Sequence, residues 1–125
     1  MSRYPYDVRF TPPAPVVELV VSTPGAGGKS LPLKGLIDSG ADITVLPDNV
    51  VTELGLQMVD EMLVGGFDGM SSVRPIYAAR ISVEDTWSII TRAVCVPGEI
   101  ALLGRDILNR WRLLLDGREQ IFEIS

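Results

Sequence analysis

The segment with the clearest capacity for chemistry is Asp38-Ser39-Gly40, a carboxylate within a short run of turn-forming residues. Two aliphatic residues precede the segment, and the apolar run 44–46 follows it. This pattern predicts a strand, a tight turn and a second strand, with the carboxylate held at the turn. A carboxyl group held in that way can act as a general acid or as a general base.

The residues that flank this turn match a known motif, which a chance Asp-Ser-Gly would not do. Leu36-Ile37-Asp38-Ser39-Gly40-Ala41 resembles the active-site signature of the aspartic proteases. Residues 101–108 resemble the aliphatic-aliphatic-Gly-Arg-Asp segment near the end of retroviral-type proteases. A glycine-rich hairpin lies between the two segments, where that family has its flap. The chain therefore resembles the retropepsin-like aspartic proteases over most of residues 15–115, and it looks more like a stand-alone cellular or bacterial member than like a viral one.

Length and composition agree with this resemblance. The 125 residues contain one Asp-Ser-Gly, 12 glycines and 9 prolines, and 46% of them are hydrophobic. Such a chain forms one domain with many short strands more readily than two lobes or a helical bundle. We expect an all-β, closed barrel-like fold with one or two short helices over residues 16–125. Residues 1–15, which are rich in proline, are expected to form an extended, unpaired arm.

Several function classes are disfavoured by composition. The formal net charge is -5 and no basic cluster occurs, so we expect neither nucleic acid nor a membrane as partner. The chain has no histidine and a single cysteine, Cys95, which we interpret as a buried apolar residue. We therefore expect no metal and no cofactor. No stretch resembles a signal peptide or a membrane span, which predicts a cytoplasmic protein.

The local patterns also predict individual elements. Strands are expected from β-branched runs, helices from a leading proline or glycine, and hairpins from Gly-containing turns. The predicted strands are 16–21, 31–37, 73–83 and 86–96; the predicted helices are 47–55 and 105–111; and a closing hairpin over 113–124 is expected to turn at Asp116-Gly117.

Hydrolysis of an amide needs a base that activates water and an acid that protonates the carbonyl oxygen. Because one chain supplies one such aspartate, this interpretation requires a symmetric homodimer in which Asp38 of each copy meets across a two-fold axis. Two carboxylates at close range cannot both ionise cheaply, as the aspartic proteases themselves illustrate. We therefore expect an aspartic endopeptidase, acting on peptides or proteins, that is most active towards acid pH.

The resemblance also implies roles for neighbouring residues. In the family, the position of Ser39 donates hydrogen bonds across the dimer, and Gly40 permits close approach of the backbone. Asp42 matches a position that touches the substrate main chain, and Arg105 matches an arginine that pairs with it. We interpret Asp106 as a capping or loop-bonding residue.

The substrate-binding residues that the resemblance implies lie in the turn, in a flap over residues 63–70 and before Gly104. They are Ala41, Asp42, Val45, Val64, Gly65, Gly66, Phe67, Ile100 and Leu102. Most are apolar, which favours hydrophobic side chains on either side of the cleaved bond, although such residues could equally belong to the core.

Two other interpretations stay open at this point. A retropepsin-like dimerisation or peptide-binding module would have the fold and the cleft with little turnover. An unrelated small β-domain with a chance Asp-Ser-Gly would be a monomer. The chain also extends beyond the resemblance through the hairpin at 113–124, so the arrangement of the chain ends in a dimer is not defined.

Overall fold

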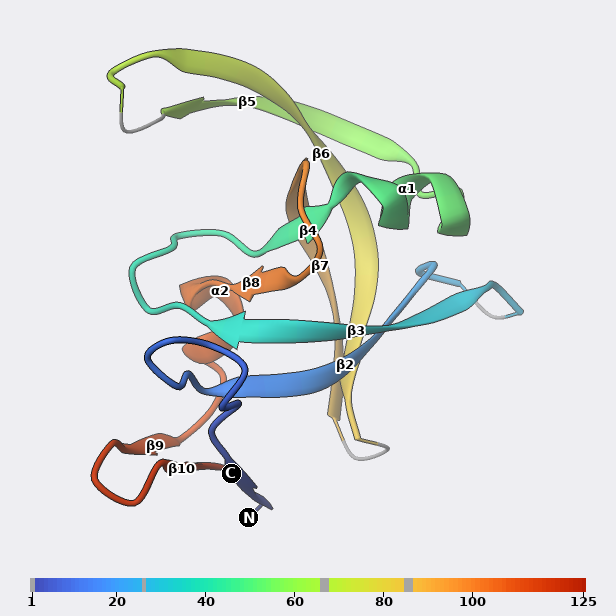
Figure 1. Ribbon diagram of the computed structural model, residues 1–125. Helices are drawn as coiled ribbons and strands as arrows, with labels where there is room; N and C mark the ends of the chain where they lie inside the picture. The colour runs from blue at the N-terminus through green and yellow to red at the C-terminus, as the bar shows by residue number, and fades with distance from the viewer. Residues whose placement is uncertain (1, 26, 66–67, 85–86) are drawn as a thin grey trace.

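The computed structural model describes residues 2–25, 27–65, 68–84 and 87–125 as a mostly β structure (Figure 1). Its elements, in chain order, are β1 (Ser2–Pro5), β2 (Val16–Ser22), β3 (Ser30–Ile37), β4 (Val45–Pro47), α1 (Asp48–Leu54), β5 (Met58–Gly65), β6 (Ser71–Val83), β7 (Trp87–Val96), β8 (Ala101–Leu103), α2 (Arg105–Leu108), β9 (Leu113–Asp116) and β10 (Ile121–Ile124).

Six strands close into a barrel. Their order is β2-β3-β8-β4-β7-β6, and a further antiparallel pairing between β2 and β6 completes the ring. The pairs β3–β8 and β4–β7 are parallel, and the others are antiparallel. Closure removes the free edges that an open sheet would have. The predicted all-β, barrel-like fold is thereby confirmed.

Alternating side chains fill the barrel. In β2, Val17, Leu19 and Val21 are buried, whereas Glu18 and Val20 between them are exposed. This period of two is what a strand with one buried face requires. The largest fully buried side chains come from strands and helices along the whole chain: Phe122, Leu19, Leu46, Ile81, Leu103 and Ile107. A single hydrophobic core therefore supports the barrel.

Helix α1 agrees with the predicted helix over 47–55. Pro47 occupies the N-cap position, and Gly55 ends the helix at φ 67°, a left-handed conformation that glycine adopts without a steric penalty. Val50 and Leu54 bury one face of the helix in the core. The helix thus covers the barrel beside β4.

The prediction that the N-terminal arm is unpaired is wrong. Strand β1 pairs antiparallel with β10, and Asp7 forms an isolated bridge with Ala14. The prolines that suggested an unpaired segment lie mostly in residues 12–15, after the strand, so they leave the N–H groups of Ser2, Arg3 and Tyr4 free to pair. The two chain ends therefore share the three-stranded sheet β1-β10-β9.

The C-terminal elements differ from prediction in extent. Helix α2 ends at Leu108, and not at residue 111, because Arg110 and Trp111 donate to Ile107 and Leu108 in tight turns. The final hairpin is present, but its loop spans residues 117–120 in place of a two-residue turn. No helix in the described part of the chain is long and apolar enough to cross a membrane.

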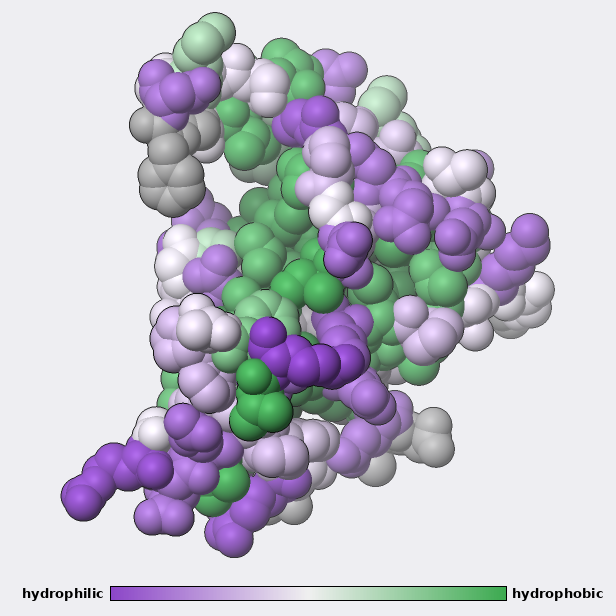
Figure 2. Space-filling view, viewed as in Figure 1, coloured by the Kyte–Doolittle hydropathy of each residue, from purple (hydrophilic) through white to green (hydrophobic). Residues whose placement is uncertain are grey.

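Strands β5 and β6 form the hairpin expected at the flap. Figure 1 shows this hairpin leaving the barrel as a long arm above the loop that follows β3. In the space-filling view an open notch, with apolar surface in its wall, separates the arm from the body of the molecule (Figure 2). The notch lies between the hairpin and the side of the molecule that carries the loop after β3.

Candidate active site

Asp38 lies immediately after β3, at the end of a strand held on both sides. Ile37 pairs with Leu103 of β8, and its N–H donates to the carbonyl oxygen of Pro15 over 3.1 Å. The N–H of Asp38 donates to the carbonyl oxygen of Leu103 over 3.1 Å. The predicted strand that delivers a carboxylate is therefore present, and barrel hydrogen bonds determine where that strand ends.

The Asp38 carboxylate is oriented by its own turn. The carboxylate Oδ1 accepts the N–H of Gly40 over 3.0 Å, and the backbone carbonyl oxygen of Asp38 accepts the N–H of Ala41 over 3.2 Å. A Cβ on Gly40 would lie only 3.3 Å from that Oδ1 atom, closer than side-chain carbons usually approach. Asp38 is half-buried, whereas Ser39 and Gly40 are exposed. The turn thus presents a held carboxylate at the surface.

Arg105 holds this turn to the start of α2. Its Nη1 donates to the carbonyl oxygen of Ser39 over 2.7 Å, and its Nη2 donates to Oδ1 of Asp42 over 2.9 Å. Its backbone N–H donates to the carbonyl oxygen of Ala41 over 2.9 Å. The ion pair expected between Asp42 and Arg105 is therefore present. Because the Asp42 side chain is 87% exposed, the ion pair adds little to the stability of the fold, and its main effect is to fix the conformation of the loop.

A buried polar network that the sequence analysis missed lies behind the turn. Thr44 is fully buried; its Oγ1 donates to Oδ1 of Asp106 over 2.8 Å, and its N–H donates to Oδ2 over 3.2 Å. The same Oγ1 accepts the N–H of Gly104 over 3.2 Å. Thr91 and Ile107 also donate to the Asp106 carboxylate. Asp106 is thus a loop-bonding residue, as expected, while Gly104 occupies the cap position of α2.

Gly104 permits the closest backbone contact of the site. A Cβ at this position would lie 2.7 Å from the carbonyl carbon of Ile43, 2.8 Å from its oxygen and 3.0 Å from the carbonyl oxygen of Ala41. Those atoms belong to backbone, which cannot rotate away as a side chain does. Only glycine therefore lets the loop 41–43 pack directly on α2.

The remaining predicted site residues are distributed over three places. Val45 and Leu102 are half-buried partners in the β4–β8 pair, next to the turn. Ile100 lines a separate depression with Pro32 and Leu33, away from the turn. On the hairpin, a shallow depression of about 400 Å³ is lined by Val64, Gly65, Asp68, Met70, Ser71 and Ser72. Gly66 and Phe67 lie outside the described residues, so their predicted roles are untested.

The base of the hairpin is tied to the barrel by two arginines. Arg92 donates to Asp60 of β5 over 2.6 Å. Arg74 of β6 donates through Nε to the carbonyl oxygen of Cys95 over 3.1 Å and pairs with Asp48 of α1 over 3.2 Å. The backbone N–H of Glu61, followed by Arg92, lowers the pKa of Asp60.

Beyond its base the hairpin exposes apolar side chains. Leu63 is 65% exposed, Val73 60% and Met70 71%. These side chains would be costly to leave in water unless they contact something else. The hairpin thus carries exposed apolar surface beyond its base.

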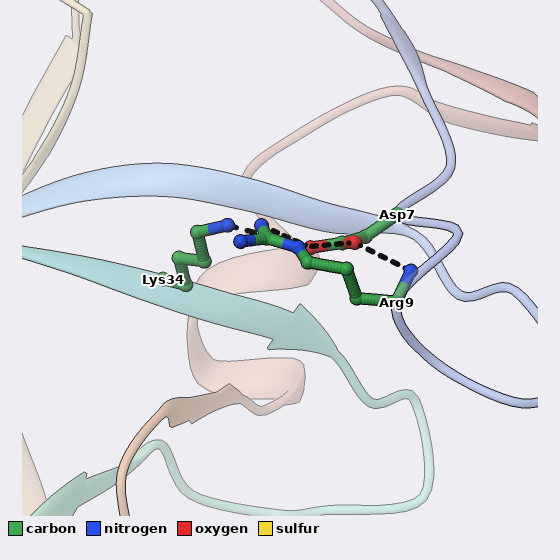
Figure 3. A network of polar contacts seen from close by, with 3 residues as sticks. All are labelled: Asp7, Arg9 and Lys34. Carbon is green, nitrogen blue, oxygen red and sulfur yellow. Dashed lines mark hydrogen bonds and ion pairs between the residues drawn. The ribbon is translucent and has the colours of Figure 1, made fainter.

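The N-terminal loop braces the strand that delivers Asp38. The Asp7 carboxylate accepts hydrogen bonds from Arg9 Nη2 at 2.8 Å and Nε at 3.0 Å, and Lys34 Nζ of β3 lies 3.5 Å from it (Figure 3). The side chain and backbone N–H of Arg9 lower the pKa of Asp7. This cluster connects residues before β2 with the middle of β3.

Cys95 is not a nucleophile at this site. Its side chain is 1% exposed, and desolvation by burial raises the pKa of the thiol to about 11. A thiol that stays protonated at neutral pH is a poor nucleophile. The interpretation of Cys95 as a buried apolar residue is confirmed.

The chemistry that one copy offers is that of a single carboxylate. Asp42, the other acidic residue of the turn, is engaged by Arg105, so it is not a free partner for Asp38. Amide hydrolysis by carboxylates needs two of them, one to accept a proton and one to donate it. One copy of the site therefore supplies half of such a pair.

Comparison with known sequences agrees with this geometry. The family model described as "gag-polyprotein putative aspartyl protease" matches residues 27–110, which include both the Asp38 turn and Arg105. DNA damage-inducible protein 1 of Eremothecium gossypii is 26% identical over 98 residues, and that of Saccharomyces cerevisiae is 24% identical over 98 residues. Each alignment covers 75% of this chain but only 21% and 23% of those proteins.

Two solved structures have a similar fold. The EIAV protease bound to an inhibitor superposes with a TM-score of 0.59 at 24% identity, covering 78% of this chain and 86% of that chain. The foamy viral protease-reverse transcriptase bound to an RNA/DNA hybrid gives 0.58 at 16% identity, covering 78% of this chain and 12% of that one. Since the family model spans more than half of the chain, this protein belongs to the retropepsin-like aspartyl protease family.

Proposed function

We propose that the chain is an aspartic endopeptidase that is active as a homodimer. The two Asp38 carboxylates, one from each copy, would hold a water molecule between them and direct it at the scissile carbonyl carbon. The observation that carries this proposal is the Asp38 carboxylate held at the end of β3, in a loop on the side of the molecule where the hairpin and the notch lie.

The proposed proton transfers use one proton shared by the pair. The ionised carboxylate removes a proton from water as its oxygen attacks the carbonyl carbon, and the protonated carboxyl donates to the carbonyl oxygen. The resulting tetrahedral intermediate collapses when the amide nitrogen is protonated and the C–N bond breaks. Since the two carboxyls of such a pair titrate together, activity is expected to favour acid pH.

The surrounding residues support the geometry that this reaction needs. Arg105 and the Thr44–Asp106 network hold the turn through five hydrogen bonds, so Asp38 keeps its orientation without a ligand. The hairpin of β5 and β6 would close over the peptide, with Leu63, Val73 and Met70 offering apolar contacts. Substrates with hydrophobic residues beside the cleaved bond are therefore favoured.

The experiment compares digestion of a denatured protein mixture between about pH 3.5 and pH 7 by the wild type, Asp38→Asn and Glu53→Gln. Glu53 is exposed on α1, so its change removes a carboxylate away from the site. The proposal predicts that wild type and Glu53→Gln cut between hydrophobic residues, and that Asp38→Asn loses at least about 10³-fold in rate.

Three results would contradict the proposal. Cleavage that persists in purified Asp38→Asn would place the activity elsewhere. A dimeric wild type that cuts neither the mixture nor a diverse peptide library would favour the peptide-binding module considered above. A chain that stays monomeric and inert would remove the basis for a carboxylate pair.

A further inference from the structure

A depression at the end of the molecule opposite the β5–β6 hairpin is lined by aromatic side chains. In Figure 1 the turn after β6 lies at the same end of the molecule as the two chain ends, away from the tip of that hairpin. Tyr4 of β1, Trp87 of β7 and Trp111, which follows α2, line a depression of about 150 Å³ there. Each of these side chains is half-buried, so part of each remains accessible to solvent.

Glu84 places a carboxylate at this depression. Its Oε2 accepts a hydrogen bond from Ser2 Oγ over 3.2 Å, and its Oε1 accepts the hydroxyl of Tyr4. Burial, followed by the hydrogen bond to Glu84, raises the pKa of Tyr4, so the phenol stays protonated and donates at neutral pH. Among the described residues that line the depression, Glu84 is the only charged one. The depression therefore combines aromatic walls with one negative charge.

Packing holds these groups in place. The rings of Trp87 and Trp111 meet edge to face, with centroids 5.0 Å apart and an interplanar angle of 66°. Tyr4 stacks on the buried ring of Phe122, with centroids 5.1 Å apart. Glu84 itself has a φ of 54°, a left-handed conformation that is uncommon for a residue other than glycine. Because the walls and the carboxylate are ordered without a ligand, little conformational entropy is lost on binding.

We propose that this depression binds a quaternary ammonium group. Its aromatic cage consists of Tyr4, Trp87, Trp111 and Glu84. A cation within about 6 Å of an aromatic ring is attracted to the negative face of that ring, and tryptophan is the strongest such partner. The carboxylate adds a direct attraction between opposite charges. A cavity of this volume can hold a benzene molecule, and a trimethylammonium group has a similar size.

The lining favours a methylated cation over a primary ammonium. A primary ammonium carries three N–H donors, each of which needs an acceptor when it leaves water. Both oxygens of Glu84 already accept a hydrogen bond, and the ring faces beside them are poor acceptors. A quaternary ammonium has no N–H group, so it can enter the cage without leaving a donor unpaired.

This inference goes beyond the proposed function and does not depend on it. The cage shares no residue with the Asp38 turn, its Arg105 fork or the Thr44–Asp106 network. Glu84→Gln should therefore leave any peptidase activity unchanged. Failure of the cage would not affect the protease assignment, and an inactive chain could still bind the cation.

Tryptophan fluorescence tests the cage directly, because both tryptophans of the chain line it. Wild type is titrated with choline, with ethanolamine and with dimethylbutanol, the neutral isostere in which carbon replaces the choline nitrogen. Concentrations reach about 100 mM at constant ionic strength. We expect a saturable change in emission with choline, and binding at least about tenfold weaker for the other two compounds. No saturable change, or equal affinities for choline and dimethylbutanol, would overturn the proposal.

Two variants assign the binding to the cage. Glu84→Gln removes the charge but keeps an oxygen that can accept the Tyr4 hydroxyl, so choline should bind about tenfold more weakly while dimethylbutanol is unaffected. Glu53→Gln, an exposed change on α1, is the matched control and should bind as wild type does. Trp111→Leu should also weaken choline binding at least about tenfold. If urea unfolding shows that Trp111→Leu does not fold, Glu84→Gln decides, and an unchanged choline affinity in that variant would overturn the proposal.

A peptide experiment distinguishes two sources of this group, free choline-type compounds and trimethylated lysine side chains. A peptide that carries trimethyl-lysine is compared with the same peptide carrying unmodified lysine. Binding tighter than that of choline would assign a modified protein as the ligand, whereas binding no tighter than that of choline would assign a small molecule. Equal binding of the two peptides would contradict selection of a methylated cation.

Discussion

The Asp38 turn and the hairpin of β5 and β6 face the same notch but are stabilised in different ways. The turn is held by buried hydrogen bonds to Thr44, Asp106 and Gly104 and by the fork of Arg105. The hairpin is bonded to the barrel at its base and exposes apolar side chains beyond it. Under the proposed function this difference is expected, because a carboxylate that pairs with its symmetry mate needs a fixed position, whereas a cover must accept different substrate side chains.

The comparison predicts that changes in the turn affect stability and activity together, and that changes in the hairpin beyond its base affect activity alone. Buried polar groups without partners raise the free energy of the native state, because they lose their hydrogen bonds to water and form none within the protein. Exposed side chains can be replaced at little cost to the free energy of unfolding.

Gly104→Ala is expected to have the largest effect. The added Cβ would lie 2.7–3.0 Å from backbone atoms of Ile43 and Ala41, so the loop or α2 must move. We expect a loss of roughly 3 kcal/mol in the free energy of unfolding, measured in urea, together with loss of activity. Gly117→Ala is the control, because a Cβ added there would meet nothing within 4 Å. A Gly104→Ala protein as stable as this control would contradict the described packing.

Thr44→Val should have the next largest effect. Valine keeps the shape but leaves the Gly104 N–H without a partner and removes one of the two hydrogen bonds that Oδ1 of Asp106 accepts. We expect a loss of about 1–3 kcal/mol in the free energy of unfolding, whereas Thr44→Ser should keep the hydrogen bonds and lose less. If serine proves as destabilising as valine, packing of the methyl group, and not the hydroxyl network, holds the turn.

Leu63→Ser tests the hairpin side of the comparison. Because Leu63 is 65% exposed, the free energy of unfolding should change by no more than about 0.5 kcal/mol. If the hairpin contacts substrate, KM should rise severalfold with a smaller change in kcat. The buried Leu46→Ala serves as contrast, with an expected loss of about 2–5 kcal/mol. Unchanged kinetics for Leu63→Ser would argue against a covering role for this residue.

The smallest expected effect concerns the pH dependence of the hairpin base. The pKa of Asp60 in the folded state lies below its ordinary value of 3.8. The ionised Asp60 side chain therefore stabilises the folded state above pH 3.8, and this stabilisation is lost as the pH falls through the lower, folded-state pKa. The difference in urea midpoint between wild type and Arg92→Gln should therefore be greatest near neutral pH and shrink below 3.8. A difference that grows on acidification would contradict this sign.

Local patterns were sufficient to predict most of the barrel. The β-branched runs that became β2, β6 and β7 lie within a few residues, as do the apolar residues of β3 before the Asp-Ser-Gly turn and the proline and glycine that bound α1. The pair of Asp42 and Arg105 was predicted because both residues belong to motifs that a family resemblance brings together. These features depend on sequence near each residue or on a known pattern.

The features that were missed depend on contacts between distant residues. Thr44 and Asp106 are separated by 62 positions, and Thr44 was interpreted as part of an apolar run. A hydroxyl inside such a run is a signal for a buried hydrogen-bonding residue, but its partner cannot be identified locally. The pairing of β1 with β10 joins the two ends of the chain, so neither strand alone predicts it.

The central claim is that one active site needs Asp38 from two chains, and subunit mixing tests it most directly. Wild type and Asp38→Asn are unfolded together, refolded at known ratios and assayed at constant total protein. If both carboxylates are required, only wild-type pairs are active, and an equal mixture keeps about one quarter of the activity. A linear decline, with about one half remaining in the equal mixture, would mean that each chain acts alone and would contradict the account.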